Sequence, residues 1–527
     1  MIFTLGLISS IALGATLTPT SGHDYAKPSL DFELQSDFRD RGALCCSSFE
    51  LGYIFMRTTV WLLQRALPLA ILLLLGTGTA SAQDRNILLI VADDLGVDVA
   101  KFYRLNVGRL TTNPPAPPTP NLAALAHNGV VFRHAWATPW CSPTRAALLT
   151  GRYPFRTGIG VPISHIPTKA NAELRLGDFT LPRAFQRARP DHYLLAHVGK
   201  WHLSRQSVND PNLAGWPYFV GPRPDNSAKL DNHYDWSKTR NGVTTDHVTR
   251  WATSDEVDEA VAFIRGAKDQ GRPYFVWLAL SAVHGPYQKA PNPLHTRDAL
   301  PDTGASDRAY FETMVQAVDT EIGRLLQDVD LTTTTVIFMG DNGTPGEVTA
   351  APYPTDRMKG TVYEGGVRVP LLVAGAGIVA PGRVVNRVVS AVDLFPTILA
   401  LAGIDPAAAV PPEAAIDGVS ILPYLENRTG TALRRYAYSE AFAPCWNNNF
   451  QRAIANDRYK LIRRKDGSGA FYDVVADPYE RTDLLPRTLT TAQRTNLNTL
   501  TRNMTELLAT GAGPCVLSTA PPDPASP

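Results

Sequence analysis

The segment Asn86-Ile-Leu-Leu-Ile-Val-Ala-Asp-Asp94 decides the fold of this chain, because a continuous apolar run ends there in two adjacent carboxylates. A short apolar run bounded by polar residues is typical of a strand that is buried on both faces. The pattern recurs at 193–198, 274–280 and 335–340, and each of these runs is followed by polar or charged side chains. We therefore expect four buried strands.

Helical patterns lie between these strands, at 254–271, 307–329 and 393–403. The first has a serine at the N-cap position and a glycine at its end, as helix termini require. Strands that alternate with helices predict an α/β fold with a mostly parallel sheet sandwiched by helices. Ligands of such sheets bind beyond the carboxyl ends of the strands, so the polar groups after the four runs should meet at one edge.

Four oxygen-bearing side chains follow two of these strands: Asp93, Asp94, Asp341 and Asn342. Oxygen-only ligand sets select Ca²⁺ or Mg²⁺, and a cation would hold two adjacent buried carboxylates ionised. Each motif also has a plain structural interpretation, because Asp93-Asp94 could cap a helix and Asp341-Asn342-Gly343 could form a turn.

Cationic or proton-donating groups occupy the same kind of position: Arg145, Lys200, His202, His284 and Lys359. Such groups stabilise developing negative charge and protonate a leaving oxygen, which predicts an anionic substrate. Taken one at a time, the lysines are typical of solvated surface residues and the histidines of structural ones. The functional interpretation depends on their shared position after strand ends.

Cys141 lies in the segment Cys141-Ser-Pro-Thr-Arg145, just before a short helical pattern. Ser142 is a good N-cap, Pro143 suits the first helical position and Gly151 a C-cap. Cys141 would then lie at a helix N-terminus, where anions are favoured. A nucleophilic thiol of low pKa is the simplest interpretation, but an extracellular thiolate is vulnerable to oxidation.

Composition and the N-terminus limit the class of protein further. The 527 residues carry a formal net charge of +1, which argues against nucleic-acid binding. The apolar run 66–76 follows two arginines and precedes Ala80-Ser-Ala82, which predicts a signal peptide over 56–82. About eleven apolar residues are too few for a transmembrane anchor. The protein is therefore expected to be secreted or periplasmic, or lysosomal or extracellular in a eukaryote.

Cleavage after Ala82 would remove Cys45 and Cys46 and leave three cysteines in an oxidising compartment. An odd number leaves one of them unpaired or modified. Cys445 and Cys515 could form a disulfide, with Cys141 as the remaining thiol, but the spacing alone does not decide this pairing.

Several blocks of the chain, in order, resemble the formylglycine-dependent sulfatases of the alkaline phosphatase superfamily. The blocks are Val91-Ala-Asp-Asp-Leu-Gly96, Cys141-Ser-Pro-Thr-Arg145 with Leu149-Thr-Gly-Arg152, Gly199-Lys-Trp-His-Leu203, Asp341-Asn-Gly343, Lys359-Gly-Thr-Val-Tyr-Glu-Gly-Gly366 and Phe471-Tyr-Asp-Val-Val-Ala-Asp-Pro-Tyr-Glu480. The resemblance covers roughly residues 84–510. It implies an alkaline phosphatase-like fold and hydrolysis of a carbohydrate or aryl sulfate ester to an alcohol and sulfate.

The resemblance also implies how the site works. A formylglycine-generating enzyme would convert Cys141 to 3-oxoalanine (formylglycine), whose hydrated form is the nucleophile. Ca²⁺, or Mg²⁺ in its place, would be bound by Asp93, Asp94, Asp341, Asn342 and the modified Cys141. Arg145 and Lys200 would hold the diol, and His202 would remove its proton to release sulfate. His284 and Lys359, with Lys200, would bind the substrate, and either His284 or Lys359 would protonate the leaving alcohol.

The expected organisation is a leader over 1–82 (an upstream extension 1–55 and the signal peptide), a catalytic domain over 83–425, a C-terminal α+β subdomain over 426–515 and a disordered tail over 516–527. Strand patterns at 435–440, 451–455, 459–463 and 471–473 and a helix at 490–509 predict a small antiparallel sheet with one packing helix. The aromatic-rich region 204–250 is expected either to rim the substrate pocket or to pack on loops. Two alternatives to a sulfatase remain: a phosphodiesterase or phosphonate hydrolase on the same scaffold, and a catalytically silent binder of sulfated glycans.

Overall fold

The computed structural model describes residues 84–103, 115–163, 173–226, 230–442 and 450–511. The predicted leader 1–82, the tail 516–527 and the proposed partners Cys445 and Cys515 lie outside these ranges. No helix within them is long and apolar enough to cross a membrane.

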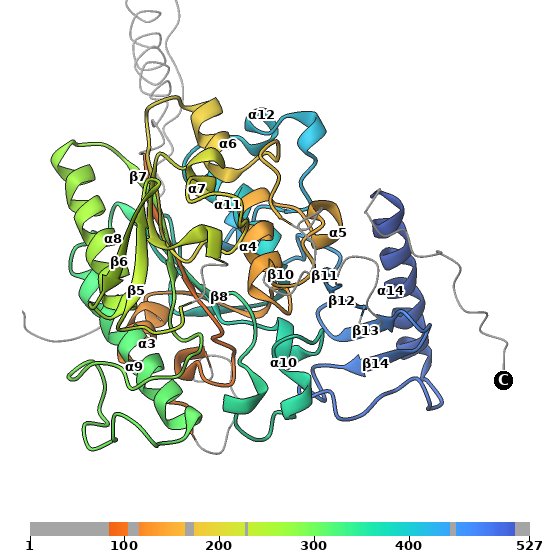
Figure 1. The fold of residues 1–527 in the computed structure, drawn as a ribbon. Coiled ribbons are helices and arrows are strands. Elements are labelled where there is room, and N and C mark those ends of the chain that lie inside the picture. The colour runs from red at the N-terminus through yellow and green to blue at the C-terminus, as the bar shows by residue number, and fades with distance from the viewer. Residues whose placement is uncertain (1–83, 104–114, 164–172, 227–229, 443–449, 512–527) are drawn as a thin grey trace, which may run out of the picture. The chain divides into compact units, whose positions relative to one another are not determined.

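A sheet of ten strands forms the centre of the fold, in the order β10-β2-β9-β8-β1-β7-β3-β4-β5-β6 (Figure 1). Its strands are β1 (Asn86–Ala92), β2 (Gly129–Trp136), β3 (Leu194–Gly199), β4 (Tyr218–Pro222), β5 (Trp236–Arg240), β6 (Val243–Val248), β7 (Tyr274–Leu280), β8 (Thr334–Gly340), β9 (Leu371–Gly375) and β10 (Arg383–Ser390).

The four strands predicted from apolar runs are β1, β3, β7 and β8, and they are neighbours in this sheet. β1 pairs in parallel with β7 and β8, and β7 pairs in parallel with β3. Their carboxyl ends therefore lie at one edge, as the sequence pattern predicts. The sheet is mixed outside this centre, because β9 runs antiparallel between β8 and β2, and β5 and β6 form an antiparallel hairpin at the margin.

Helices cover both faces of this sheet, and β1 shows why its strands are apolar throughout. Ile87, Leu89 and Val91 point to one core, and Leu88 and Ile90 point to the other. The first core includes α4 (Cys141–Thr150), α6 (Leu181–Ala188), α11 (Leu394–Leu401) and α13 (Leu422–Leu425); the second includes α3 (Pro120–His127), α8 (Ala252–Asp269) and α9 (Asp307–Leu326). Further short helices are α5 (Pro154–Thr157), α7 (Asp210–Leu213), α10 (Glu364–Val367) and α12 (Pro406–Ala409).

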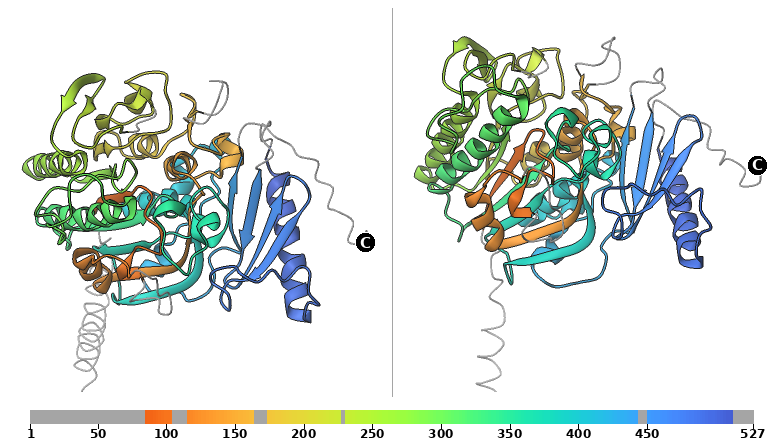
Figure 2. Two further views of the ribbon diagram at one scale, coloured as in Figure 1. Left: turned by 60° about the horizontal axis from the view of Figure 1, so that its bottom comes forward. Right: turned by 90° about the horizontal axis from the view of Figure 1, so that it is seen from below.

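A second sheet of four antiparallel strands lies beside the first one, with a single long helix on its outer face (Figure 2). It consists of β11 (Ala437–Ala441), β12 (Gln451–Ala455), β13 (Tyr459–Arg464) and β14 (Gly469–Asp473), and the helix is α14 (Thr491–Ala509). This arrangement matches the antiparallel sheet and packing helix predicted for the C-terminal part of the chain.

Two helices begin earlier than the sequence predicts. Helix α4 begins at Cys141 with Trp140 as the N-cap, so Ser142 is not its cap. Pro143 fits inside the first turn because the N–H groups there have no intrahelical acceptor in any case. Helix α8 begins at Ala252, so Ser254 lies inside its first turn. The Ser254 hydroxyl does not cap the helix and instead donates a hydrogen bond to Glu321 of α9 (2.5 Å).

Candidate active site

The centre of the candidate site is the turn that follows β1. Asp93 and Asp94 are both buried there, and Asp94 has a φ of 61°, a left-handed conformation that aspartate adopts more readily than most residues other than glycine. The amide N–H of Asp94 donates to Oδ1 of Asp341 (3.1 Å), which joins the ends of β1 and β8. The plain cap and turn interpretations therefore miss the main feature of these residues, which is their convergence.

Arg145 connects helix α4 to both carboxylates. Its guanidinium donates two hydrogen bonds to Oδ2 of Asp341 (3.1 and 2.8 Å) and lies 3.6 Å from Oδ2 of Asp93. A third hydrogen bond goes to the carbonyl oxygen of Lys200 (2.8 Å). The side chains of Arg145, Asp93 and Asp341 are all buried, so Arg145 connects helix α4 to the ends of β1 and β8 inside the protein.

Cys141 faces two of the groups predicted to act on it. Its Sγ lies 3.2 Å from Nδ1 of His202 and 4.0 Å from Nζ of Lys200. Lys200 also forms a short ion pair with Asp93. His202 has a φ of 55°, which turns the segment after β3 so that Lys200 and His202 both point toward α4.

The remaining predicted residues surround Asp94. Lys359 Nζ lies 2.5 and 2.6 Å from the two carboxylate oxygens of Asp94, and the side-chain amide of Asn342 donates to its Oδ1 (2.8 Å). His284 Nε2 lies 3.9 Å from Oδ2 of Asp94. All the residues predicted from the sequence to form the catalytic and metal site therefore lie in one connected group.

Burial and mutual charge shift the pKa values of this group in opposite directions. Burial alone would raise the pKa of Asp93, but attraction to Lys200, His284 and Arg145 holds it well below its usual range. Burial and repulsion from Asp93 raise the pKa of Asp341 to about 7. Burial, with repulsion from Lys200 and Arg145, lowers the pKa of His202 well below its usual range, so this ring is neutral.

The Cys141 thiol is not the acidic thiol that its place at a helix N-terminus favours. Burial raises its pKa to about 11, and the nearby Lys200 offsets burial only in part. The thiolate that nucleophilic attack requires is therefore scarce at neutral pH. The geometry supports a nucleophile at this position, but the unmodified side chain is poorly suited to that role.

The donor atoms fit a hard cation. Oδ1 of Asp93 and Oδ1 of Asn342 are buried side-chain oxygens without a hydrogen-bond partner, and leaving such atoms unpaired costs about 1–3 kcal/mol each. Two groups of ligand atoms lie within 4.8 Å of one another, namely those of Asp93, Asp94 and His284 and those of Asp93, Cys141 and Asp341. The carboxylate and amide oxygens among these atoms favour Ca²⁺ or Mg²⁺ over softer metals, whereas His284 offers a nitrogen and Cys141 a sulfur.

A cavity of about 650 Å³ opens onto this group. Asp94, His284 and Lys359 line it and are named the inner wall because they are buried or half-buried, and Trp140 and Tyr287 contribute aromatic rings. Its further lining residues are Leu230, Asp231, Gly285, Pro286, Asp307, Pro345, Gly346 and Glu347. Its volume is within the range of small-ligand sites, about 300–1,000 Å³.

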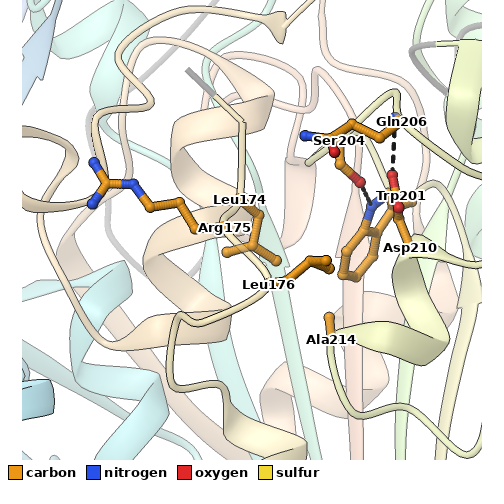
Figure 3. A pocket seen from close by; sticks show the side chains of 8 residues that line it. All are labelled: Leu174, Arg175, Leu176, Trp201, Ser204, Gln206, Asp210 and Ala214. Atoms are coloured by element: carbon orange, nitrogen blue, oxygen red, sulfur yellow. Dashed lines mark hydrogen bonds between the residues drawn. The ribbon is translucent and has the colours of Figure 1, made fainter. Parts of the chain in front are cut away.

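A second, much smaller pocket lies against the ring of Trp201, the residue between Lys200 and His202 (Figure 3). It measures about 10 Å³, which is room for about one water molecule. The indole N–H of Trp201 donates to Ser204 (2.8 Å). This pocket is too small for a substrate, and Ser204 supports the Trp201 ring rather than the reaction centre.

Two histidines that the sequence did not indicate as part of the site contact the main chain of site residues. Nε2 of His197 lies 3.1 Å from the Lys200 carbonyl oxygen, and Nε2 of His233 lies 3.1 Å from the His284 carbonyl oxygen. Both rings are buried, and burial lowers the pKa of His197 to about 3 and that of His233 to about 4. A lone histidine in a sequence carries no signal for this kind of role.

The aromatic-rich region 204–250 contributes less to the cavity than a pocket rim would. Trp216 and Trp236 are buried in the core, and among the described residues of this region only Leu230 and Asp231 line the cavity. The packing interpretation therefore holds for these tryptophans.

Comparison with known proteins gives consistent matches. A family model described as Sulfatase matches residues 85–404, and one described as N-sulphoglucosamine sulphohydrolase, C-terminal, matches residues 357–508. The N-acetylgalactosamine-6-sulfatase of Homo sapiens is 31% identical over 382 residues, which is 66% of this chain and 67% of that protein. Arylsulfatase A of Bos taurus is 30% identical over 438 residues, 77% of this chain and 80% of that protein. The crystal structure of Ps i-CgsB in complex with k-i-k-neocarrahexaose has a TM-score of 0.65 at 26% identity, over 81% of this chain and 93% of that one.

Proposed function

The chain belongs to the sulfatase family, and from that premise we propose that it removes sulfate from a sulfated sugar with formylglycine at position 141 as the nucleophile. The protein is a sulfuric ester hydrolase. Two relatives support a sugar substrate, because one is named for N-acetylgalactosamine 6-sulfate and the other was solved with a neocarrahexaose. The substrate of this chain is proposed by analogy with them.

The observation that carries the proposal is the environment of Cys141. Its Sγ lies between His202 Nδ1 (3.2 Å) and Lys200 Nζ (4.0 Å), at the start of a completely buried helix. Burial raises the pKa of the thiol to about 11, so a site built around a nucleophile holds a poor one in its unmodified form. Conversion to formylglycine by a formylglycine-generating enzyme resolves this mismatch, since the hydrated aldehyde supplies an oxygen nucleophile and a second hydroxyl for release of sulfate.

The side chains around position 141 have distinct tasks in this scheme. Lys200 and Arg145 offset the negative charge that develops there, and His202 accepts the proton whose loss allows sulfate to depart. His284 and Lys359 line the cavity, where Lys359 binds the sulfate group and His284 protonates the leaving alcohol. These tasks use general acid–base and electrostatic catalysis, worth about 10²–10⁴-fold for each positioned group.

We propose Ca²⁺ as the resident cation, with Mg²⁺ as the alternative. Asp93, Asp94, Asp341 and Asn342 would hold it together with the modified side chain at position 141. The unpaired buried oxygens of Asp93 and Asn342 support this ligand set. When bound, the cation supplies Lewis-acid stabilisation of negative oxygen.

We further propose that the chain has a leader over 1–82 that directs secretion, a catalytic domain over 83–425, a C-terminal subdomain over 426–515 and a disordered tail over 516–527. The apolar run at 66–76 and the Ala80-Ser-Ala82 sequence support the leader.

Mass spectrometry of the secreted protein tests the proposal. The tryptic peptide from His134 to Arg145 should show loss of sulfur and two hydrogens and gain of one oxygen at Cys141, and the N-terminal peptide should begin at Gln83. The converting enzyme is supplied during expression. If the resulting protein still carries an unmodified thiol at position 141 and nevertheless hydrolyses sulfate esters, the formylglycine nucleophile is contradicted. Matched aryl sulfate and aryl phosphate substrates check the phosphodiesterase alternative, which requires the phosphate ester to be hydrolysed faster.

A further inference from the structure

The cavity beside the catalytic group has to accommodate the sugar, and this inference rests on the function proposed above. Asp94, His284 and Lys359 form its inner wall, so a sulfate held there leaves the rest of the cavity for the ring that carries it. The chemistry of the outer lining therefore selects among sulfated sugars.

The outer lining is acidic. Asp231, Asp307 and Glu347 line it, and all three are exposed to solvent. They come from three separate parts of the chain: the segment before β5, the first residue of α9, and the loop after β8. Lys359 is the one lysine or arginine among the described lining residues, and its charge is matched by Asp94 at 2.5 Å.

The basic neighbour of Asp307 does not compensate the charge of that carboxylate. Arg308 follows Asp307, but its Nε lies 2.8 Å from Oε1 of Glu312, and its Nη1 binds the Val348 carbonyl oxygen. The guanidinium is therefore directed into the protein and away from Asp307, and no lysine or arginine other than Lys359 lines the cavity among the described residues.

The same wall suits a neutral sugar ring. Trp140 and Tyr287 offer aromatic surface to the apolar face of a pyranose. The Tyr287 hydroxyl donates to Oε1 of Glu347 (3.3 Å), which leaves the other carboxylate oxygen of Glu347 available to a sugar hydroxyl. Carboxylates accept strong hydrogen bonds from hydroxyl groups.

We propose that this part of the cavity is a sugar subsite for a ring that carries a single sulfate, and that Asp231, Asp307 and Glu347 exclude a second anionic group from it. Two like charges about 4 Å apart repel by about 1 kcal/mol in water, which is about a fivefold change in an equilibrium or rate ratio. The three carboxylates thus make the site selective for esters whose remaining groups are uncharged.

Two matched aryl sulfates test this selectivity without requiring the natural sugar: 4-nitrophenyl sulfate and its 3-carboxy derivative. The measured quantity is the ratio of their kcat/KM values, in wild-type enzyme and in the variant D231N/D307N/E347Q. We expect the variant to raise the relative kcat/KM of the carboxylated ester by about fivefold or more. In the wild-type enzyme, high salt should bring the kcat/KM value of the carboxylated ester closer to that of 4-nitrophenyl sulfate, because salt screens exposed charges.

Glu413→Gln is the control, because Glu413 is also an exposed carboxylate and does not line the cavity. It should leave the ratio unchanged. If both esters are hydrolysed but the wild-type ratio does not respond to salt and the triple variant has the same ratio, the proposed subsite is wrong. Hydrolysis of neither ester by the modified wild-type enzyme would instead refute the proposed function, and the subsite with it.

Discussion

His284 presents a single ring nitrogen to the substrate cavity. Its Nδ1 donates to the Gly285 carbonyl oxygen (2.7 Å) and is occupied there, so Nε2, 3.9 Å from Oδ2 of Asp94, is the nitrogen that has to take up a proton and pass it to a leaving group. The contact from His233 to the His284 carbonyl oxygen keeps the main chain in place. Lys359 is held differently, because both oxygens of Asp94 lie within 2.6 Å of its Nζ. The two residues should therefore contribute to catalysis in different ways.

Replacing His284 by alanine should lower kcat/KM for sugar sulfates more than for activated aryl sulfates. An alkoxide leaving group requires protonation, which a positioned acid accelerates about 10²–10⁴-fold, whereas a nitrophenolate departs without it. We expect Lys359→Ala to slow both substrates by similar factors, because it removes a sulfate contact common to both. Measuring kcat/KM for a sugar sulfate and 4-nitrophenyl sulfate in each variant checks this, and equal losses in His284→Ala would contradict the assigned role.

At the scale of elements, the site depends on how closely the loops after the strands approach one another. Gly343 follows the proposed ligands Asp341 and Asn342, and its N–H donates to the carbonyl oxygen of Gly366 in α10 (2.9 Å). A Cβ atom on Gly343 would lie 1.7 Å from the Gly365 carbonyl oxygen. The absence of a side chain at Gly343 therefore lets the loop after β8 pack against the segment that carries Lys359.

The change Gly343→Ala should separate these two loops. Overpacking of this kind costs about 1–3 kcal/mol of stability, and it should also weaken the rise in melting temperature produced by added Ca²⁺. Thermal unfolding with and without Ca²⁺ measures both effects. Gly266→Ala in α8 is the matched control, since nothing lies within 4 Å of its added Cβ and alanine stabilises a helix by about 0.5–1 kcal/mol. A full Ca²⁺ response in Gly343→Ala would show that the loop spacing does not position the ligands.

At the scale of the whole molecule, the small sheet holds the segment that carries Lys359. Lys460 of β13 is fully buried, and its Nζ lies 3.1 Å from Glu364 Oε1 and 2.9 Å from Glu480 Oε1. Glu480 accepts a short hydrogen bond from the Glu364 amide, and its carbonyl oxygen accepts one from Arg357. Both ends of the segment 357–364 are therefore attached to the C-terminal part of the chain.

Replacing Lys460 by methionine should destabilise the protein in a pH-dependent way. Burial already raises the pKa of Glu480 to about 7 against the attraction of Lys460, so the folded protein binds a proton more tightly than the unfolded chain does. Stability from this group is therefore lost as pH rises through 7. Without Lys460 the pKa rises further, and we expect a loss of about 3–5 kcal/mol at pH 8 and a smaller loss at pH 5.

Urea unfolding at the two pH values measures this difference. The double variant K460M/E480Q should regain part of the stability, because it removes a carboxylate that has lost its cation. Lys465→Met is the control, since Lys465 is exposed in the turn after the same strand. Equal destabilisation by Lys460→Met at pH 5 and pH 8 would contradict the role of Glu480 ionisation. In folded enzyme, a lower kcat or a higher KM for Lys460→Met would report displacement of Lys359.

The central sheet and most of the site could be predicted because their signals are local. The apolar run of β1 ends directly in Asp93, and parallel pairing then requires the ends of β3, β7 and β8 to lie beside it. Contacts between distant segments have no such local pattern in the sequence. The residues around Lys460 in the sequence do not indicate that its side chain lies between Glu364 and Glu480. The predicted start of α4 was wrong for a related reason. Ser142-Pro143 satisfies the local rules for a helix start, but the helix begins one residue earlier, at Cys141.

The balance of charge in the centre of the site couples its two prospective occupants. Asp93, Asp94 and Asp341 face Arg145, Lys200 and Lys359 in direct pairs, so the group is close to electrically neutral as folded. A divalent cation alone would leave an excess of positive charge, and a sulfate alone an excess of negative charge. Each should therefore bind more tightly in the presence of the other, by the same factor in both directions. The enzyme would then hold its product most strongly when its metal is in place, which makes sulfate release, rather than sulfate capture, the step that this architecture has to facilitate.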